Sequence, residues 1–162
     1  MTAKLDKILK LGDPILYQRS EEVSPDEVSG LMPDIDLLFE LILEFRTAYG
    51  EGRGIAAPQI GLLKRIFCLD LDNKKHIIIN PQLTGLSEEM MEVLDFCMCF
   101  PALKVKVLRH RRCLLKYRDE NWVEQSRELE GDLSQLVQHE YDHLDGILAT
   151  QRVIDNKSFS TR

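Results

Sequence analysis

The pentad His139-Glu140-Tyr141-Asp142-His143 is the part of the sequence with the clearest chemical meaning. If the surrounding run forms a helix, positions i and i+4 lie on one face about one turn apart. Two imidazoles at that spacing can bind one divalent ion, and the intervening Glu140 can take a proton from water on the ion. The pentad therefore predicts a metal centre on a helix. The alternative is a surface helix that carries two histidines by chance.

A metal centre that stays open for water and substrate needs a third protein ligand besides the two histidines. His76 and His110 each lie beside a charged run, which favours exposure over metal binding. Cys97 becomes attractive by elimination, because a thiolate is a suitable ligand for zinc or ferrous iron. From the residues alone, the third ligand stays open among these side chains.

The four cysteines fall into two groups. Cys68 and Cys113 lie within apolar or alternating runs, and we expect them to be buried in strands as small hydrophobic residues. Cys97 and Cys99 are separated by one residue, a spacing that would put both on the same side of a strand. The start of the chain lacks the pattern of a secretory signal, so we expect a cytoplasmic protein, in which disulfides are rare.

Length and composition are typical of a soluble globular protein. The chain has 162 residues, of which 44% are hydrophobic and 30% are charged. That length predicts one domain, residues 1–162, with a core of its own. No apolar run reaches the roughly 18 residues that a membrane span requires. A net charge of -6 argues against direct binding of nucleic acid, and the basic run 109–112 is interpreted as a solvated or substrate-facing strand.

The elements that must position these residues follow one another simply. Ser24-Pro25-Asp26 predicts a helix start, and residues 33–48 place their apolar side chains on one helical face. A glycine-rich loop follows at 51–61. Ser134 or Asp132 would cap the last helix, which carries the pentad. Short β-type runs lie between the loop and this helix, at 64–71, 76–83, 89–96, 103–109 and 113–122.

This order of elements predicts an α+β fold rather than a doubly wound one. We expect short antiparallel β-sheets packed around a central C-terminal helix, and we expect that helix to carry the H-E-x-x-H metal site.

Three segments resemble, in the same order, the motifs of peptide deformylase, the enzyme that removes the N-formyl group from new bacterial and organellar polypeptides. Residues 52–61, GRGIAAPQIG, match the first motif, G-x-G-h-A-A-x-Q, at every defined position. Residues 138–146, QHEYDHLDG, match the third motif, Q-H-E-x-D-H-x-x-G, completely. Weaker similarity extends over most of the chain, through GDPIL at 12–16, IINP at 78–81 and VLR at 107–109.

The middle motif departs from the family pattern. The family's E-G-C-L-S is Asp95-Phe96-Cys97-Met98-Cys99 in this chain. Cys97 keeps the family's cysteine ligand. Phe96 replaces a glycine beside it, where the family's backbone comes close to the substrate, so an aromatic ring there could narrow the pocket. Cys99 replaces a serine and is nearly isosteric, but it is a poorer hydrogen-bond partner.

The resemblance implies a mechanism and assigns roles to individual residues. Cys97, His139 and His143 would hold one divalent ion, Fe²⁺ in the first place and Zn²⁺ as the alternative. Glu140 would accept the proton of the attacking water and deliver it to the departing amine. Gln59 would donate to the formyl oxygen.

The resemblance also implies how a substrate lies. Gly54 and Ile55 would pair with its backbone as if adding a strand, and the backbone N–H of Met98 would be a second donor to the formyl oxygen. Leu136, with Gln135 beside it, would line the pocket for the first side chain, although plain core packing is an equal alternative for Leu136. The substrates implied are N-formylmethionyl peptides or nascent chains, the latter at the ribosome.

Two other functions stay open from the sequence. One is a metallohydrolase that acts on another N-acyl peptide or amide, and Phe96 is the feature in its favour. The other is a non-catalytic, deformylase-like protein that binds only metal or peptide. Glu140 and Gln59 argue against the second, because a chain freed from catalysis has no evident need for both.

Overall fold

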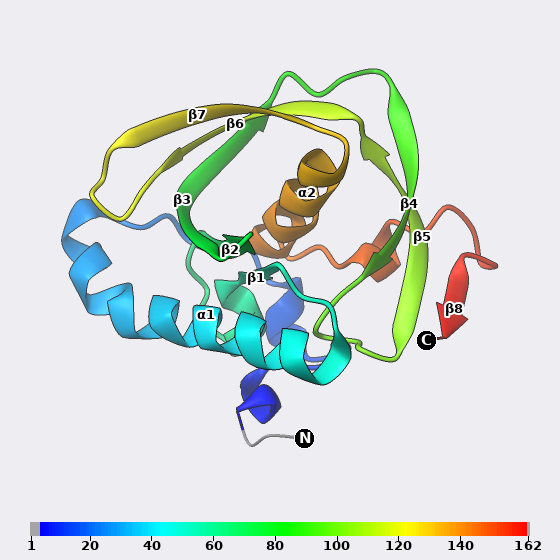
Figure 1. Cartoon of the computed structure of the whole chain (residues 1–162), viewed down its shortest axis with the longest axis horizontal. Coiled ribbons are helices and arrows are strands. Elements are labelled where there is room, and N and C mark those ends of the chain that lie inside the picture. The colour runs from blue at the N-terminus through cyan, green and yellow to red at the C-terminus, as the bar shows by residue number, and fades with distance from the viewer. Residues whose placement is uncertain (1–3, 162) are drawn as a thin grey trace.

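In the computed structural model, which describes residues 4–161, the pentad lies on helix α2 (Asp132–Leu144). This helix runs between two antiparallel sheets, and the longer helix α1 (Val28–Tyr49), which lies below it in Figure 1, packs against the first two strands of the five-stranded sheet. One sheet has five strands in the order β1-β2-β3-β6-β7, and the other has three in the order β4-β5-β8. The expected α+β fold with a central C-terminal helix is therefore confirmed.

All strands except the 11-residue β3 have at most eight residues, and all neighbouring pairs in the two sheets are antiparallel. The larger sheet consists of β1 (Gly54–Ala56), β2 (Ile66–Leu71), β3 (Lys74–Thr84), β6 (Arg112–Arg118) and β7 (Glu124–Glu130). The smaller sheet consists of β4 (Met90–Phe96), β5 (Leu103–His110) and β8 (Phe159–Thr161). Short 3₁₀ helices link these elements: η1 (Leu5–Lys7), η2 (Pro14–Tyr17), η3 (Pro25–Glu27), η4 (Ala57–Ile60) and η5 (Ala149–Gln151).

Helix α1 begins where the sequence predicts a helix start. The Ser24 N–H donates to the Glu27 carboxylate at 2.8 Å, and η3 then runs directly into α1. For this reason the helix begins earlier than the predicted range 33–48. Gly50 ends it with a left-handed φ of +74°. The predicted apolar face is buried in the core, through Ile35, Leu38, Phe39, Ile42 and Phe45.

Helix α2 is buried along most of its length. Leu136, Val137 and Leu144 pack against Phe67 and its neighbours in the larger sheet, within one core cluster. The predicted side-chain cap of this helix was wrong, because both candidate residues have tertiary partners instead. The Ser134 hydroxyl donates to the His110 carbonyl at 2.9 Å, and the Asp132 carboxylate pairs with an arginine outside the helix.

Three strands, β1, β7 and β8, were not predicted. Strand β1 lies inside the segment interpreted as a glycine-rich loop, and it is three residues long. Strand β7 has the sequence EQSRELE, in which only Leu129 is buried, so it carries no alternation of apolar and polar residues. It pairs with β6 along its whole length as an edge strand. Strand β8, three residues long, pairs with β5. Tertiary pairing, which no local pattern reports, creates all three strands.

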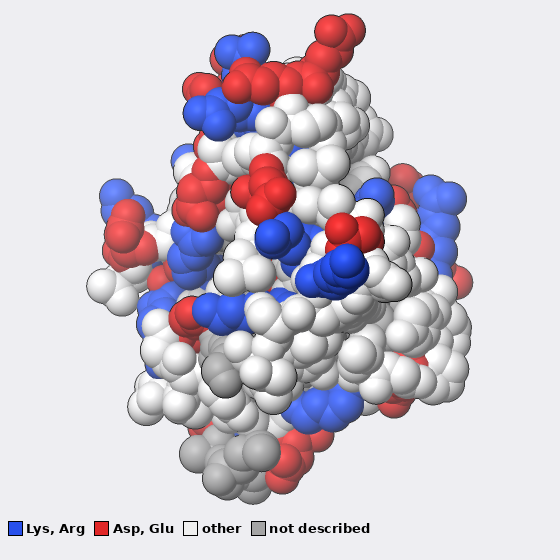
Figure 2. Space-filling view, turned by 90° about the vertical axis from the view of Figure 1, so that its right-hand side faces the viewer, with Lys and Arg blue, Asp and Glu red and all other residues white. Residues whose placement is uncertain are grey.

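The surface carries charges of both signs. On the face formed by the smaller sheet, lysine and arginine side chains are interspersed with aspartate and glutamate (Figure 2). Among the described residues, that face therefore presents no extended basic patch of the kind that binds nucleic acids. Within residues 4–161, no helix has the length and apolar character that crossing a bilayer demands.

Gly146 allows the segment after α2 to pack closely against the backbone of the N-terminal part of the chain. It has a φ of +73°, and a Cβ there would lie 2.6 Å from the Tyr17 carbonyl carbon and oxygen. We expect Gly146→Ala to lower the free energy of unfolding by clearly more than the roughly 1–2 kcal/mol of a left-handed alanine. Gly50→Ala is the matched control, since Gly50 has nearly the same φ, +74°, and no atom within 4 Å of such a Cβ. Equal losses in chemical unfolding would contradict the role of the Tyr17 contact.

Candidate metal centre and active site

Three potential metal ligands from distant parts of the sequence meet where β4 ends against α2. The Cys97 Sγ lies 3.3 Å from the His143 Nε2. One ligand atom each of Cys97, His139 and His143 lies within 4.8 Å of the others, and all three residues are buried. A thiol and two imidazoles this close fit one ion such as Zn²⁺ or Fe²⁺ and leave a coordination position free. Within residues 4–161, His76 and His110 belong to no such group.

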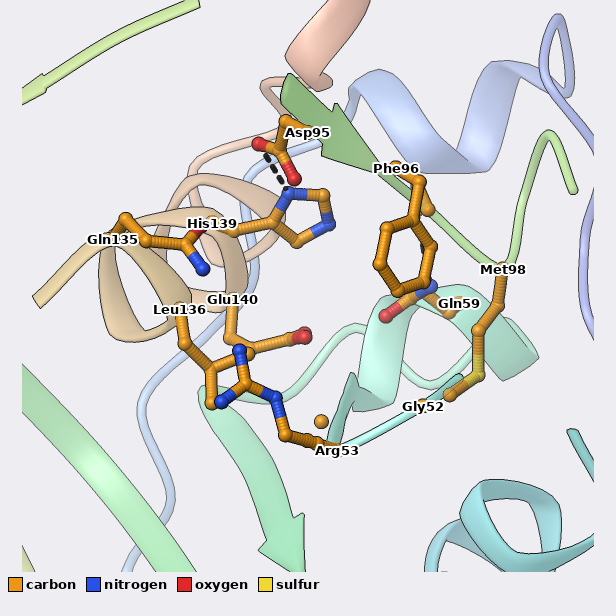
Figure 3. A pocket seen from close by; sticks show the side chains of 12 residues that line it. Gly52, Arg53, Gln59, Asp95, Phe96, Met98, Gln135, Leu136, His139 and Glu140 are labelled. Carbon is orange, nitrogen blue, oxygen red and sulfur yellow. Dashed lines mark hydrogen bonds and ion pairs between the residues drawn. The ribbon is translucent and has the colours of Figure 1, made fainter. Parts of the chain in front are cut away.

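His139 is held in one orientation by Asp95. The His139 Nδ1 lies 2.9 Å from the Asp95 Oδ2 (Figure 3), which leaves the Nε2 of the ring for an ion. Arg109 donates to the same carboxylate oxygen at 3.0 Å. Burial alone would raise the pKa of Asp95, but His139 and Arg109 outweigh burial and lower it to about 2. Asp95 therefore stays ionised behind the histidine.

Arg109 was predicted to lie on a solvated or substrate-facing strand, and that prediction was wrong. Only 2% of its surface is exposed, and its second guanidinium nitrogen donates to Asp142 at 2.6 Å. Arg152 donates to the same Asp142 carboxylate from the outer side. On β5, Arg109 shares the inward face with Val105 and Val107. This spacing of two residues could have indicated that the Arg109 side chain is buried.

Glu140 points into the site from α2. Its side chain is buried, and within residues 4–161 its Oε2 has no hydrogen-bond partner. A Cβ on Gly54 would lie 2.6 Å from the Glu140 Oε1, so only glycine at position 54 leaves room for this carboxylate. Burial, with a smaller contribution from Asp95, raises the pKa of Glu140 to about 7. A carboxyl group with this pKa can both accept and donate a proton near neutral pH.

Gln59, on η4, lies against two cysteine sulfurs. Its Oε1 accepts from the Ala56 N–H at 2.8 Å, and its Nε2 lies 3.5 Å from the Cys97 Sγ and 3.4 Å from the Cys99 Sγ. Burial raises the pKa of the Cys97 thiol, whereas a bound cation would favour the thiolate.

The sequence predicted that Cys97 and Cys99 lie on one side of a strand, and that prediction was wrong. Strand β4 ends at Phe96, and the chain then turns, with the Phe100 N–H donating to the Cys97 carbonyl at 3.0 Å. The expectation for the other two thiols is confirmed, because Cys68 is buried in β2 and Cys113 in β6.

A pocket opens beside these residues (Figure 3). Most of the residues that the sequence singled out line it, whereas Ile55 and His143 are almost fully buried behind its wall. The pocket is lined by Gly52, Arg53, Gly54, Gln59, Asp95, Phe96, Cys97, Met98, Gln135, Leu136, His139 and Glu140.

Two side chains set the width of this pocket. The Phe96 ring stands on the opposite side from Leu136 and Glu140 (Figure 3). Arg53, which lines one edge of the pocket, reaches from the segment before β1 to Asp132 at the start of α2 and forms an ion pair with it. Arg53 occupies one of the two undefined positions of the first motif, so no pattern in the sequence singled it out.

Comparison with known proteins gives one consistent result for the sequence. Residues 5–159 match the family model of polypeptide deformylase. The peptide deformylase of Leptospira biflexa is 37% identical over 164 residues, covering 94% of this chain and 90% of that protein. The peptide deformylase of Fusobacterium nucleatum is 39% identical over 149 residues, covering 91% of this chain and 83% of that protein.

Solved structures agree with the sequence comparison. The crystal structure of peptide deformylase from Thermotoga maritima superposes with a TM-score of 0.83 at 32% identity, covering 91% of this chain and 97% of that chain. The deformylase of Synechococcus elongatus in complex with actinonin superposes with a TM-score of 0.85 at 28% identity, covering 93% and 80%. Because sequence and fold match over nearly the whole chain, the protein belongs to the polypeptide deformylase family.

Proposed function

We propose that the protein hydrolyses the formamide bond of N-formylmethionyl peptides with one divalent ion held by Cys97, His139 and His143. As a member of the family it is a metal-dependent hydrolase that removes the formyl group from an N-terminal methionine. The convergence of one thiol and two imidazoles within 4.8 Å, beside a pocket, carries the assignment of the site. Such an ion, when bound, supplies Lewis acidity that lowers the pKa of water and polarises a carbonyl.

Glu140 is the proposed proton carrier. Its carboxylate lines the pocket, and one of its oxygens lacks a hydrogen-bond partner within residues 4–161. That oxygen is free to accept the proton of a water molecule and to deliver it to the departing amine. Gly54 leaves room for the Glu140 carboxylate, because a side chain at position 54 would collide with the Oε1.

Gln59 and the backbone N–H of Met98 are the proposed donors to the formyl oxygen. The contact between the Gln59 Oε1 and Ala56 fixes the amide, so its Nε2 faces the site. The contacts of this nitrogen with the two sulfurs, 3.5 Å and 3.4 Å, leave it able to turn toward a stronger acceptor. A donor of this kind is typically worth about 10²–10³ in rate.

The edge of the larger sheet is the proposed track for the peptide. Strand β1 is the first strand of that sheet and pairs only with β2 within the described chain. The edge of β1 opposite β2 can pair with an extended backbone at Gly54, which lines the pocket, and at Ile55 once a peptide displaces the groups that bury it. Leu136 and Gln135, which line the pocket from α2, would then face the first side chain of the substrate.

Fe²⁺ is the proposed native ion, with Zn²⁺ as the alternative, because a thiolate and two imidazoles suit both metals. New polypeptides are the proposed natural substrate. The protein would meet them in the cytoplasm, at the ribosome, where their formylated ends first appear.

A second function is favoured by one feature, the Phe96 ring in the pocket. If the ring fills space that a formyl-methionyl chain requires, the natural substrate is another N-acyl peptide or amide. The metal centre and Glu140 would serve that hydrolysis equally well, because the Phe96 ring occupies substrate space in the pocket and is not one of the proposed metal ligands.

The metal ligands can be tested by comparing the two cysteines at the centre. We predict one divalent ion per chain in anaerobically purified protein, severe loss of that ion in Cys97→Ala and retention in Cys99→Ala. Only the first change removes a member of the three-donor group. Elemental analysis gives both the amount and the identity of the ion. Equal losses in the two variants would mean that the thiol assignment is wrong.

The role of Glu140 can be tested by a change that keeps its shape. Anaerobically purified wild-type protein should hydrolyse formyl-methionyl peptides. The Glu140→Gln variant should retain the ion, but its kcat should fall by about 10²–10⁴-fold, the usual contribution of general acid–base catalysis. Steady-state deformylation and metal content are measured on the same samples. A variant that works at nearly the wild-type rate would exclude Glu140 as the proton carrier.

Phe96→Gly separates the two candidate substrates. We expect the variant to have a lower KM and a higher kcat/KM for formyl-methionyl peptides at unchanged metal content, since the ring stands in the pocket and Cys97 is untouched. Leu94→Gly, on the same strand with a side chain 52% exposed, controls for a glycine in β4. A loss of about 3–5 kcal/mol in unfolding, the cost of a buried phenylalanine, with no gain in turnover would favour the second function.

A further inference from the structure

Two thiols lie together at the proposed metal centre, although the three-donor group includes only one of them. Cys99 stands where the family motif has serine. The Cys99 N–H donates to the Cys97 Sγ at 3.5 Å, so the sulfur of Cys97 is folded back toward residue 99. The Gln59 Nε2 contacts both sulfurs. The turn that follows β4 therefore holds the two thiols close together, both within reach of the same Gln59 amide nitrogen.

The other cysteines of the chain are not placed in this way. Cys68 lies in β2 and Cys113 in β6, both strands of the larger sheet. The Cys113 Sγ accepts from the Ser134 hydroxyl at 3.4 Å. Within the described chain, the only two cysteines that share one turn are those at the metal centre.

Access from solvent distinguishes the two thiols. Cys97 lines the pocket, whereas Cys99 is not part of its wall and exposes only 1% of its surface. A small oxidant that enters the pocket therefore reaches Cys97 first. Cys99 lies behind it, in the position of a resolving thiol.

From this arrangement we propose that Cys97 and Cys99 form a reversible disulfide when a hydroperoxide enters the pocket. The Cys97 sulfur attacks the peroxide oxygen, the O–O bond breaks, and Cys97–SH + ROOH gives Cys97–SOH + ROH. The Cys99 sulfur then attacks the sulfenic sulfur, the S–O bond breaks, and water leaves with the Cys99 proton. In sum, the two thiols are oxidised by two electrons, and the peroxide is reduced to an alcohol and water.

The disulfide protects the site as well as inactivating it. Without a neighbouring thiol, a sulfenic acid proceeds to sulfinic and sulfonic acids, which thiols do not reduce. With Cys99 beside it, the oxidation stops at a bond that a dithiol can open. In the disulfide Cys97 is no longer available as a ligand, so the ion leaves. This last step rests on the proposed ligand role of Cys97, whereas formation of the bond does not.

The experiment treats metal-loaded protein with hydrogen peroxide, without substrate, and then blocks the remaining thiols with N-ethylmaleimide. Mass spectrometry of the tryptic peptide 76–104, which contains both residues, counts the blocked thiols independently of methionine oxidation. We expect the wild-type peptide to lose two hydrogen atoms and both labelling sites, and dithiothreitol to restore the sites. The ion should be released together with this change and should rebind after reduction and reloading.

Cys99→Ser is the decisive variant, because it restores the family's serine and removes only the resolving thiol. Its Cys97 should gain two or three oxygen atoms, and dithiothreitol should not reverse this change. Cys113→Ser, in the other sheet, should behave as the wild type. The same irreversible oxidation in wild type and Cys99→Ser would overturn the proposal, and so would a disulfide to Cys68 or Cys113. Failure of the proposed hydrolysis would appear separately, as a metal-loaded, fully reduced protein that does not turn over formyl-methionyl peptides.

Discussion

The buried ion network behind the metal centre is the constraint on which the rest of the site depends. Arg109 of β5 donates to Asp95 of β4 and to Asp142 of α2, and Asp95 in turn fixes the ring of His139. A buried network of this kind is costly to break, because removing one partner leaves a charge without compensation. It joins the smaller sheet to the central helix and fixes the rotation of that helix about its own axis. The positions of the two histidine rings and of Glu140 follow from this rotation.

The parts of the fold that local patterns determine could be predicted from the sequence. The apolar face of α1 has helical spacing, and Ser24, Pro25 and Asp26 mark the start of the helical segment. The pentad and the two complete motifs identify the family, and with it the order of helix, short strands and helix. These features succeed because each is encoded by residues within one or two turns of one another.

What the sequence could not predict depends on contacts between distant segments. Strand β7 exists because β6 lies beside it, and its own residues show no strand pattern. Arg109 belongs to a run of charges that looks solvated until Asp95 and Asp142 are placed around it. Asp132 looks like a helix cap until Arg53, 79 positions away, is found to pair with it. In each case a long-range electrostatic or backbone partner overrides the local preference.

The pair Arg53–Asp132 differs from the buried network in its exposure to water. The side chains of this pair are 41% and 64% exposed, whereas those of Arg109 and Asp95 are 3% and 6% exposed. Ion pairs exposed to water contribute at most about 1 kcal/mol, and salt screens them. The pocket therefore has one wall that rests on buried charges and one edge where the ion pair is exposed to water. Salt therefore weakens the electrostatic contact at the Arg53 edge of the pocket, whereas the buried charges behind His139 are screened much less.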